Sequence, residues 1–380
     1  MTEAPLVQGW CPGALRPMLS GDGYVLRVRP RLGRLSADQA AGVAALALAH
    51  GNGLIDLSAR ANVQLRGVRA DSHAPLIAGL RALGLIDDSV AQESRRNIVV
   101  QPFWGDSDPT LAIAADLTAA LAAPDAPDLP GKFGFAVDCG LRRVLDGTAA
   151  DIRLTRQGDQ LVLRAEGSFR AKVVSPDTAA AEALALARWF LAMGGVTQGR
   201  GRMAALMARG VALPEGFTLE TPVQAYDAAP GACAQGQLVG FEFGQMQAET
   251  LAALARLGAL RVTPWRMLLI EGATQAPALP GVISDPASPL LRVIACTGAP
   301  GCTQALQPTR ALARALAPHL SVPLHVSGCA KGCAHPGPAP LTLTATVEGF
   351  ALIRDGTAAD MPLSTHSMAD LIARPDILTE

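Results

Sequence analysis

Four cysteines stand in two close pairs near the C-terminal end of the sequence and limit what the chain can fold into. Five residues separate Cys296 from Cys302, and three separate Cys329 from Cys333. Between the pairs lies an apolar segment, residues 312–320, which is long enough for a helix that returns the chain to the same point. Glycines flank the thiols, where the backbone must pass close to a bulky inorganic core; they are Gly298, Gly301, Gly328 and Gly332. We therefore expect the four thiolates to converge on one metal centre.

Four cysteine ligands suit either zinc or an iron–sulfur cluster. The paired ligands of structural zinc sites usually have about two to four residues between them. The five-residue gap in the first pair therefore disfavours zinc. Buried free cysteines are the remaining alternative. The other three of the seven cysteines lie far apart, so the clustering of these four favours a metal site.

Composition excludes several classes of protein. The 380 residues are 49% hydrophobic and 17% charged, so the chain is not disordered and can form more than one domain. The net charge of -1 and the small number of aromatic residues give no basis for a nucleic-acid partner or an anionic membrane. The sequence shows neither a secretory signal nor an apolar run of membrane-spanning length, and seven cysteines do not suggest a secreted disulfide scaffold. We expect a cytoplasmic protein.

The order of predicted elements occurs twice along the chain. Alternating polarity predicts a strand over residues 24–29, and a capping-box pattern at Ser36 begins a helix that runs to His50. A strand region over 54–68 and a helix over 73–83 follow. Later the strand–helix–strand order returns over residues 238–243, 247–257 and 261–271.

The segments that follow each copy also correspond. Strands are predicted over 97–103 and 291–295, hairpins over 151–166 and 341–355, and helices over 178–193 and 367–373. Chance repetition of common elements is the alternative, but the shared order of at least four elements disfavours it. The sequence therefore predicts an α/β (α+β) protein made of two fused copies of one unit.

The two copies differ on one strand. Alternation places Arg60, Asn62, Gln64 and Arg66 on one face, whereas the corresponding residues 265–272 have lost nearly all of that polarity. Two arginines with two amides can hold an anionic ligand rich in acceptors. An ordinary solvated face is the alternative. The polar face occurs in one copy alone, however, and this favours a binding site. Two more basic segments, 94–97 and 129–135, belong to the same half.

Together these motifs resemble the sirohaem sulfite/nitrite reductase superfamily, whose members bind a [4Fe-4S] cluster through a C-x5-C…C-x3-C pattern. The matching stretches are the four cysteines, residues 60–67, Arg96-Asn97 and residues 129–134. The resemblance implies a pseudo-twofold duplication of ferredoxin-like half-domains and α/β domains that bind the cluster and a tetrapyrrole. It implies ferredoxin-like half-domains at 1–88 and 216–277, a tetrapyrrole-binding α/β domain at 89–215 and a cluster α/β domain at 278–380. In the reductases the last cysteine, here Cys333, bridges the cluster to sirohaem.

One departure separates this sequence from the reductases. Gly134 stands where their second catalytic lysine would be, and reduction of sulfite or nitrite consumes protons at every stage. Residues 9–18 and 20–23 instead look like the precorrin-3B synthases of aerobic cobalamin biosynthesis, a branch of the same superfamily. That resemblance implies a mono-oxygenase that uses O2 to hydroxylate precorrin-3A at C20 and closes a γ-lactone. The implied substrate-binding residues are Arg60, Asn62, Gln64, Arg66, Arg96, Asn97 and Lys132.

The resemblance also carries expectations about electron supply. NADH is the implied electron source, but no G-x-G-x-x-G follows a strand, so we expect a separate reductase as partner. A mononuclear non-haem iron is implied too, although the six histidines are scattered and no ligand set can be identified. Among them only His335 lies near the cysteines, as a neighbouring or structural group. A sirohaem-dependent reductase and a non-enzymatic electron-transfer or zinc-stabilised protein remain as alternatives.

Overall fold

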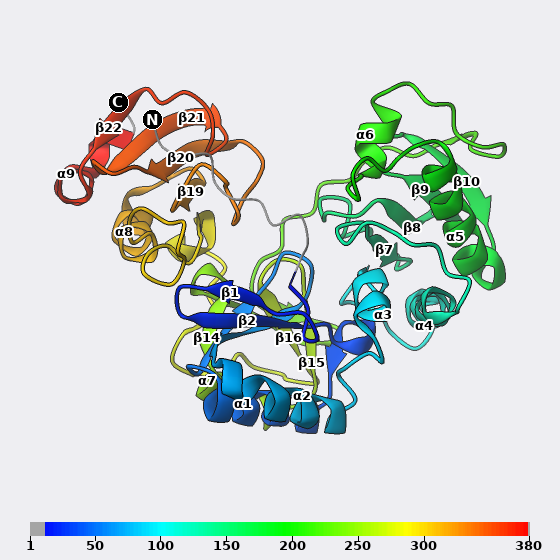
Figure 1. The fold of residues 1–380 in the computed structure, drawn as a ribbon, viewed down its shortest axis with the longest axis horizontal. Helices are drawn as coiled ribbons and strands as arrows, with labels where there is room; N and C mark the ends of the chain where they lie inside the picture. The colour runs from blue at the N-terminus through cyan, green and yellow to red at the C-terminus, as the bar shows by residue number, and fades with distance from the viewer. Residues whose placement is uncertain (1–11, 379–380) are drawn as a thin grey trace.

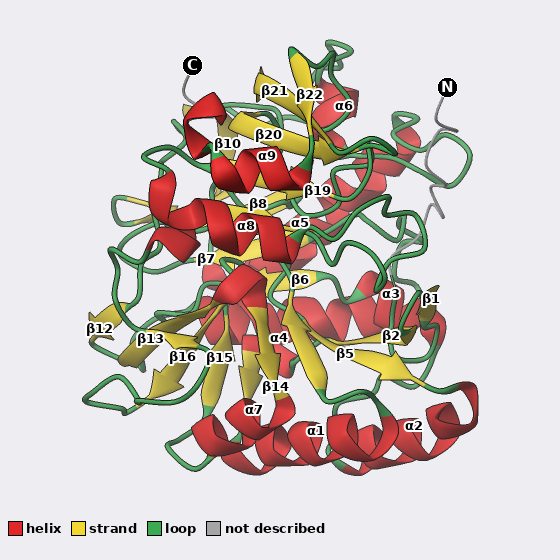
Figure 2. Ribbon diagram, turned by 90° about the vertical axis from the view of Figure 1, so that its left-hand side faces the viewer, coloured by secondary structure: helices red, strands yellow, loops and turns green. Residues whose placement is uncertain are grey.

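The computed structural model describes residues 12–378, which form a base and two lobes (Figure 1). The base contains a five-stranded and a six-stranded sheet with a layer of helices beneath them (Figure 2). One lobe is built from residues 90–220 and the other from residues 293–378. The lobes rise from the base on opposite sides and leave a gap between their ribbons in Figure 1.

The two sheets of the base exchange one strand each. The first has the order β1 (Met18–Ser20), β2 (Gly23–Val28), β5 (Val63–Val68), β4 (Leu54–Leu57) and β14 (Gln245–Gln247). The second has the order β12 (Gly231–Cys233), β13 (Gly236–Phe241), β16 (Met267–Glu271), β15 (Leu260–Val262) and β3 (Arg34–Leu35), and β17 (Val282–Ile283) pairs with β13. Strand β14 of the second copy thus completes the first sheet, and β3 of the first copy completes the second. The halves of the base interlock.

Three helices cover the lower face of both sheets: α1 (Ala37–His50), α2 (His73–Ala82) and α7 (Ala248–Ala255). The capping box predicted at Ser36 is confirmed, because its side chain accepts from the Gln39 backbone while the Gln39 side chain accepts from the Ser36 backbone. The helices and both sheets share one apolar core that includes Leu26, Leu65 and Leu268. The apolar face of the first sheet therefore points down, and its polar face points up toward the lobes.

The first lobe is a six-stranded sheet with helices packed against it. Its order is β11 (Leu219–Glu220), β10 (Arg170–Val174), β9 (Gln160–Ala165), β8 (Ile152–Gln157), β7 (Phe135–Asp138) and β6 (Ile98–Val100). The last three strands are parallel and the others antiparallel. Its helices are α3 (Val90–Arg95), α4 (Thr110–Ala122), α5 (Pro176–Ala192) and α6 (Met203–Met207).

The second lobe repeats this arrangement in smaller form. Its order is β18 (Val293–Ala295), β19 (Leu324–Ser327), β20 (Ala339–Ala345), β21 (Phe350–Gly356) and β22 (Ser364–His366), with helices α8 (Arg310–Leu316) and α9 (Met368–Ala373). Again three parallel strands are followed by antiparallel ones. The predicted duplication and α/β (α+β) class are confirmed.

The duplication extends to unusual backbone angles. Leu32 and Phe243, before the exchanged strands, have φ of 54° and 55°, and the glycines that follow them both have φ of 71°. Ala61 and Arg266 are a second such pair, with φ of 51° and 61°. Left-handed residues are uncommon outside glycine, so their recurrence at matching places fixes the correspondence between copies.

The same left-handed residues correct two of the predicted strands. Residues 54–68 and 261–271 were each expected to form one strand region, but each forms two strands joined by a turn at Ala61 or Arg266. The four domain ranges remain a prediction. The structure adds that the two predicted half-domains exchange strands β3 and β14. Within residues 12–378, no helix is long and apolar enough to cross a membrane.

Candidate functional site

The four cysteines follow two neighbouring parallel strands of the second lobe. Cys296 comes directly after β18, and Cys329 lies two residues after β19. These strands pair Ala295 with Val326, so their carboxyl ends meet at one edge of the sheet. The backbone N–H of Gly328 donates to Cys296 Sγ at 3.1 Å. The topology thus brings the two cysteine pairs to one place.

Small residues make this loop cluster possible. A Cβ at Gly298, which has φ of 69°, would lie 2.6 Å from Thr309 Oγ1. That hydroxyl donates to the Cys296 carbonyl at 2.7 Å and so fixes the start of the loop. A Cβ at Gly328 would lie 2.7 Å from the Ala305 Cβ. The flanking glycines identified in the sequence are therefore required by close backbone packing.

The thiols lie close enough to influence one another. Burial raises the pKa of Cys329 and of Cys333, and the neighbouring cysteines raise both pKa values further. Among the described residues, no three His, Cys, Asp or Glu side chains are spaced to hold one metal ion. Four thiols gathered on neighbouring loops are the donor set of an iron–sulfur cluster. The donor set, the glycines and the N–H bond to sulfur fit such a cluster.

Two histidines that are ten residues apart in sequence meet beside the cysteine loops. The rings of His325 and His335 lie 5.6 Å apart. His325 is fully buried, and neither of its ring nitrogens has a hydrogen-bond partner within the described chain. Burial, His335 and Arg266 lower the pKa of His325 to about 4, so the ring is neutral at neutral pH. The described residues present no complete ligand set for a mononuclear iron.

The polar strand face that the sequence predicted is present and larger than expected. Asn62, Gln64 and Arg66 share one face, but β5 begins at Val63, so Arg60 lies in the preceding turn and not on the strand. The left-handed Ala61 interrupts the alternation. Strand β2 adds Arg27 and Arg29, because Arg27 pairs with Gln64 across the sheet. The alternating pattern of residues 24–29 contained this signal, but pairing with β5 could not be read from the sequence.

Arg66 connects this face to the cysteine loop. It is 6% exposed, and its Nε and Nη2 donate to both oxygens of Asp22 at 2.8 and 2.7 Å. Its Nη1 donates to Asp56 at 3.3 Å and its Nη2 to the Gly301 carbonyl at 3.1 Å. Ser20 Oγ and the Gly21 N–H also donate to that carbonyl. Arg66 therefore holds the residue before Cys302 against the base.

The remaining candidates occupy the other end of the face. Arg60 Nη1 donates to the Lys132 carbonyl at 3.0 Å, and Asn97 Nδ2 donates to the Phe133 carbonyl at 2.9 Å. These bonds place the Lys132 segment beside the turn before β5, and the Lys132 side chain is exposed. Arg96 instead is buried and forms two hydrogen bonds of 2.9 Å with Asp87. Arg96 thus has a carboxylate partner inside the protein.

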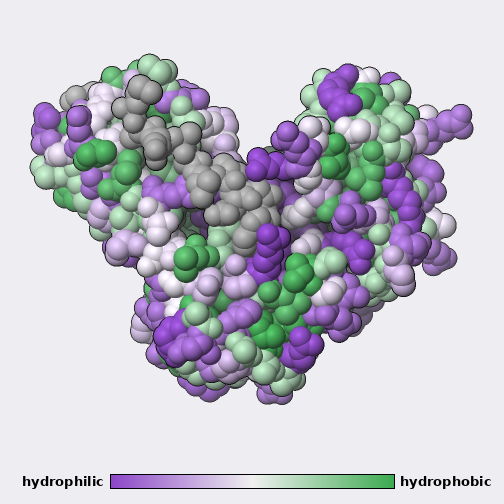
Figure 3. Space-filling model, in the orientation of Figure 1, coloured by the Kyte–Doolittle hydropathy of each residue, from purple (hydrophilic) through white to green (hydrophobic). Residues whose placement is uncertain are grey.

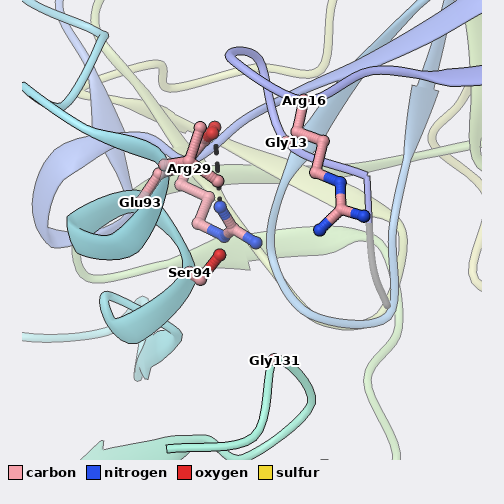
Figure 4. A pocket seen from close by; sticks show the side chains of 7 residues that line it. Gly13, Arg16, Arg29, Glu93, Ser94 and Gly131 are labelled. Carbon is pink, nitrogen blue, oxygen red and sulfur yellow. Dashed lines mark ion pairs between the residues drawn. The ribbon is translucent and has the colours of Figure 1, made fainter. Parts of the chain in front are cut away.

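A small cavity of about 20 Å³ lies at the same end (Figure 4). Gly13, Arg16, Arg29, Glu93, Ser94 and Gly131 are among its lining residues. Arg29 pairs with Glu93 at 3.6 Å, and the Glu93 carboxylate also accepts from the backbone of Ala14 and Leu15. A Cβ at Gly13 would collide with that carboxylate. Part of the N-terminal motif is thereby explained; its first residues, through Cys11, lie outside the described chain.

Figure 3 shows a notch between the two lobes, with hydrophilic residues on the wall of the first lobe. The described cysteine loop contacts the base through Gly301, and the Lys132 segment contacts it through Arg60. The arrangement can hold an anionic ligand on one side and a metal cluster on the other.

Comparison with known proteins agrees with this arrangement. Residues 16–83 match the nitrite/sulfite reductase ferredoxin-like half domain. A precorrin-3B synthase of Sinorhizobium sp. is 32% identical over 416 residues, which cover 98% of this chain and 89% of that protein. The chain belongs to the precorrin-3B synthase family. It is therefore a member of an enzyme family, as the sequence predicted.

More distant relatives place the precorrin-3B synthase family within the larger superfamily. A ferredoxin–nitrite reductase of Synechococcus elongatus is 24% identical, over 96% of this chain and 86% of that protein. The structure of the NirA protein of Mycobacterium tuberculosis superposes with a TM-score of 0.62 at 18% identity, over 93% of this chain and 79% of that one. The latter likeness concerns the fold alone. Both agree with the predicted sulfite/nitrite-reductase-like fold.

Proposed function

We propose that the protein acts as a precorrin-3B synthase, an O2-dependent mono-oxygenase that hydroxylates precorrin-3A at C20 with γ-lactone formation in aerobic cobalamin biosynthesis. One oxygen atom of O2 enters the substrate and the other leaves as water, which consumes two electrons and two protons. The observation that carries this proposal is the 32% identity to a precorrin-3B synthase over 98% of the chain. The absence of a membrane-spanning helix among the described residues is compatible with action in the cytoplasm.

The environment of Gly134 supports this proposal over a reductase. A Cβ at Gly134 would lie 2.8 Å from Asn97 Nδ2 and 3.1 Å from the Asn97 carbonyl oxygen. A lysine at this position would need Asn97 to move, although Asn97 is buried and bonded to Phe133. The packing at position 134 thus fits a glycine and leaves no room for a lysine. The proton donor that the lysine would supply is absent.

The polar face and its neighbours would bind the substrate. Precorrin-3A carries acetate and propionate groups, which arginine and lysine side chains bind through charge-assisted hydrogen bonds. Arg60 and Lys132 lie together at one end of the face, with Arg16 and Arg29 beside them. Asn62, Gln64 and Asn97 would add hydrogen bonds to these groups. Arg66 and Arg96, which already hold Asp22 and Asp87, would add positive charge near them. Gln64 is itself fixed by Arg27, which donates to its amide oxygen at 2.9 and 3.2 Å.

The cysteines would hold a [4Fe-4S] cluster. When bound, the cluster would supply electrons to the site one at a time. Cys296, Cys302, Cys329 and Cys333 would be its ligands, and the Gly328 N–H would hydrogen-bond one ligand sulfur. A separate reductase that oxidises NADH would deliver the electrons.

Spectra and turnover test the proposal together. The protein, purified without oxygen, should show broad iron–sulfur absorbance without haem bands, and an electron paramagnetic resonance signal after dithionite. Incubated with precorrin-3A, a reductant and isotopically labelled O2, it should give a product that contains one labelled oxygen. Arg60→Ala should weaken precorrin-3A binding while leaving the cluster spectrum unchanged. Arg69→Ala, at an exposed position, should change neither the binding nor the spectrum.

A sirohaem-dependent sulfite or nitrite reductase is the alternative, because the Synechococcus relative is a nitrite reductase. Strong sirohaem bands in the purified protein, together with reduction of sulfite or nitrite, would replace the proposal with this alternative. Loss of the cluster in Arg60→Ala would instead show that Arg60 is structural.

A further inference from the structure

The first lobe has an open cavity at the place where the second lobe has its cysteines. Gln101 directly follows β6 as Cys296 directly follows β18, and Gly140 lies two residues after β7 as Cys329 lies two after β19. Both Gln101 and Gly140 line a cavity of about 580 Å³. Ligands bind preferentially outside the carboxyl ends of parallel strands, in cavities of about 300–1,000 Å³. The duplication thus created a second site of suitable size and position.

Hydrogen bonds fix the side chains at the floor of this cavity, and both oxygens of its one carboxylate, that of Asp108, already accept hydrogen bonds. Gln101 is 2% exposed and accepts from the Phe103 N–H at 2.7 Å. Gln101 Nε2 donates to Asp108 at 2.8 Å, and the other Asp108 oxygen accepts from the Thr110 N–H at 2.8 Å. A Cβ at Gly140 would lie 3.0 Å from Gln101. Asp108, with both oxygens bonded, is a poor acceptor for a cationic ligand.

Aromatic rings form one wall. Phe103 and Tyr226 line the cavity, and Trp265 supports both from behind, at ring distances of 5.8 and 5.0 Å. Burial raises the pKa of Tyr226, so its phenol stays neutral and does not repel an anion. Flat ring faces bind flat ring faces, with a preference for offset stacking.

Arg142 is the only cationic side chain among the described residues that line the cavity. Its guanidinium carbon lies 4.8 Å from the Tyr226 ring centroid, and no described residue forms a hydrogen bond or ion pair with it. The nearby Arg261 cannot take this role, because it binds Glu271 and the carbonyls of Pro102 and Trp104. The polar face at β5 has several cationic side chains, whereas this cavity has one.

We infer that this cavity binds a planar aromatic molecule that carries a single anionic group. The Phe103 ring stacks on the ligand, the Tyr226 ring, which is inclined at 63° to that of Phe103, packs against its edge, and Arg142 binds its anion. A tetrapyrrole with many carboxylates is a poor match, because the arginine-rich face has no counterpart on β16. The inference does not depend on the proposed function or on the cysteine site.

Fluorescence titration with anilinonaphthalene sulfonate, an aromatic anion with a flat naphthalene ring and a single sulfonate, tests the inference on the full chain. The unmodified protein should bind the probe saturably. Arg142→Gln should weaken binding about tenfold, as expected for loss of one charge-assisted contact. Tyr226→Leu should weaken it about fivefold through loss of the edge contact. Arg142→Lys should restore most of the affinity, and all variants should keep the circular dichroism spectrum of the unmodified protein.

Two controls separate this cavity from other surfaces. Arg69→Gln, the same exchange at an exposed position outside the cavity, should leave probe binding unchanged. Thioflavin T, an aromatic cation, should not lose affinity in Arg142→Gln. The inference is overturned if the unmodified protein shows no saturable binding, or if Arg142→Gln and Tyr226→Leu bind the probe as well as it does.

Discussion

The two sheets of the base share a backbone but not a surface. Ala61 and Arg266 have the same left-handed conformation, and β5 and β16 follow them in the same register. Yet β5 presents Asn62, Gln64 and Arg66 where β16 presents Met267, Leu269 and Glu271. Backbone geometry has therefore been retained in both copies while polar chemistry remains in one. The proposed substrate face belongs to that copy because its strand carries the side chains that can bind an anion.

In the lobes it is the second copy, and not the first, that carries the residues of the proposed site. The second lobe carries the cysteines at the ends of its parallel strands, and the first has Gln101 and Gly140 at those positions. The proposed site thus takes its polar face from one copy and its cysteines from the other. Arg66 joins them, since it donates to Gly301 in the cysteine loop.

Exchange of one cysteine within the two close pairs and of one outside them should give the largest contrast. Cys329→Ser should abolish cluster binding, because a hydroxyl is a poor substitute for an iron–sulfur thiolate. Iron content and visible absorbance after anaerobic reconstitution measure this. Cys233→Ser, in the hairpin of the second copy, should retain the full cluster. Equal iron content in both variants would contradict the assignment of the four ligands.

The sequence predicted the features that depend on spacing and local order. The cysteine pattern, the doubled element order and the capping box at Ser36 are all short-range signals, and the last two are confirmed. The exchange of β3 and β14 could not be foreseen, because pairing between strands so far apart in sequence is decided by tertiary packing.

Side-chain partners were the least predictable part of the site. The sequence singled out Arg66 and Arg96 as ligand-binding residues, but nothing local showed that Asp22 and Asp87 would face them. His325 and His335 likewise meet only because β19 and the following loop fold together. Arg27 and Arg29 were read as strand residues, and only their register with β5 places them at the site.

Removal of Arg66 tests whether the copies are held together at this point. Arg66→Ala leaves Asp22 and the buried Asp56 without their shared guanidinium, which should lower the free energy of unfolding by about 3 kcal/mol. Urea denaturation of the cluster-free protein measures the change. Arg69→Ala removes an exposed pair with Asp71 and should change stability by less than about 0.5 kcal/mol. Equal effects would mean that Arg66 contributes no more than a surface residue.

Asp138 at the end of β7 corresponds to Ser327 at the end of β19, so the first lobe has a buried acid where the second has a hydroxyl. Burial raises the pKa of Asp138 from 3.8 to about 6 against the opposing hydrogen bonds from Leu145 and Val144. The folded state therefore keeps this proton between pH 4 and 6 while the unfolded state releases it, so stability falls as pH rises through that window.

Asp138→Asn should remove this dependence. The variant should be more stable than the unmodified protein by about 2 kcal/mol at pH 7 and nearly equal to it at pH 4, as denaturation curves at both pH values would show. Asp159→Asn, at a fully exposed turn, should alter neither curve. A constant difference between the Asp138 variant and the unmodified protein across this range would exclude titration of Asp138 as the cause.

Gly134→Lys sharpens the comparison between this family and its reductase relatives. The new side chain meets Asn97 within 2.8 Å, so we expect a loss of about 1–3 kcal/mol in urea denaturation. Gly131→Lys, in the same loop but with no atom within 4 Å of its Cβ, should be nearly neutral. If the two variants are equally stable, packing does not exclude a lysine at 134, and its absence must reflect the reaction alone. If only Gly134→Lys is destabilised, the loop has been rebuilt around glycine, and return to a reductase would require changes at Asn97 as well.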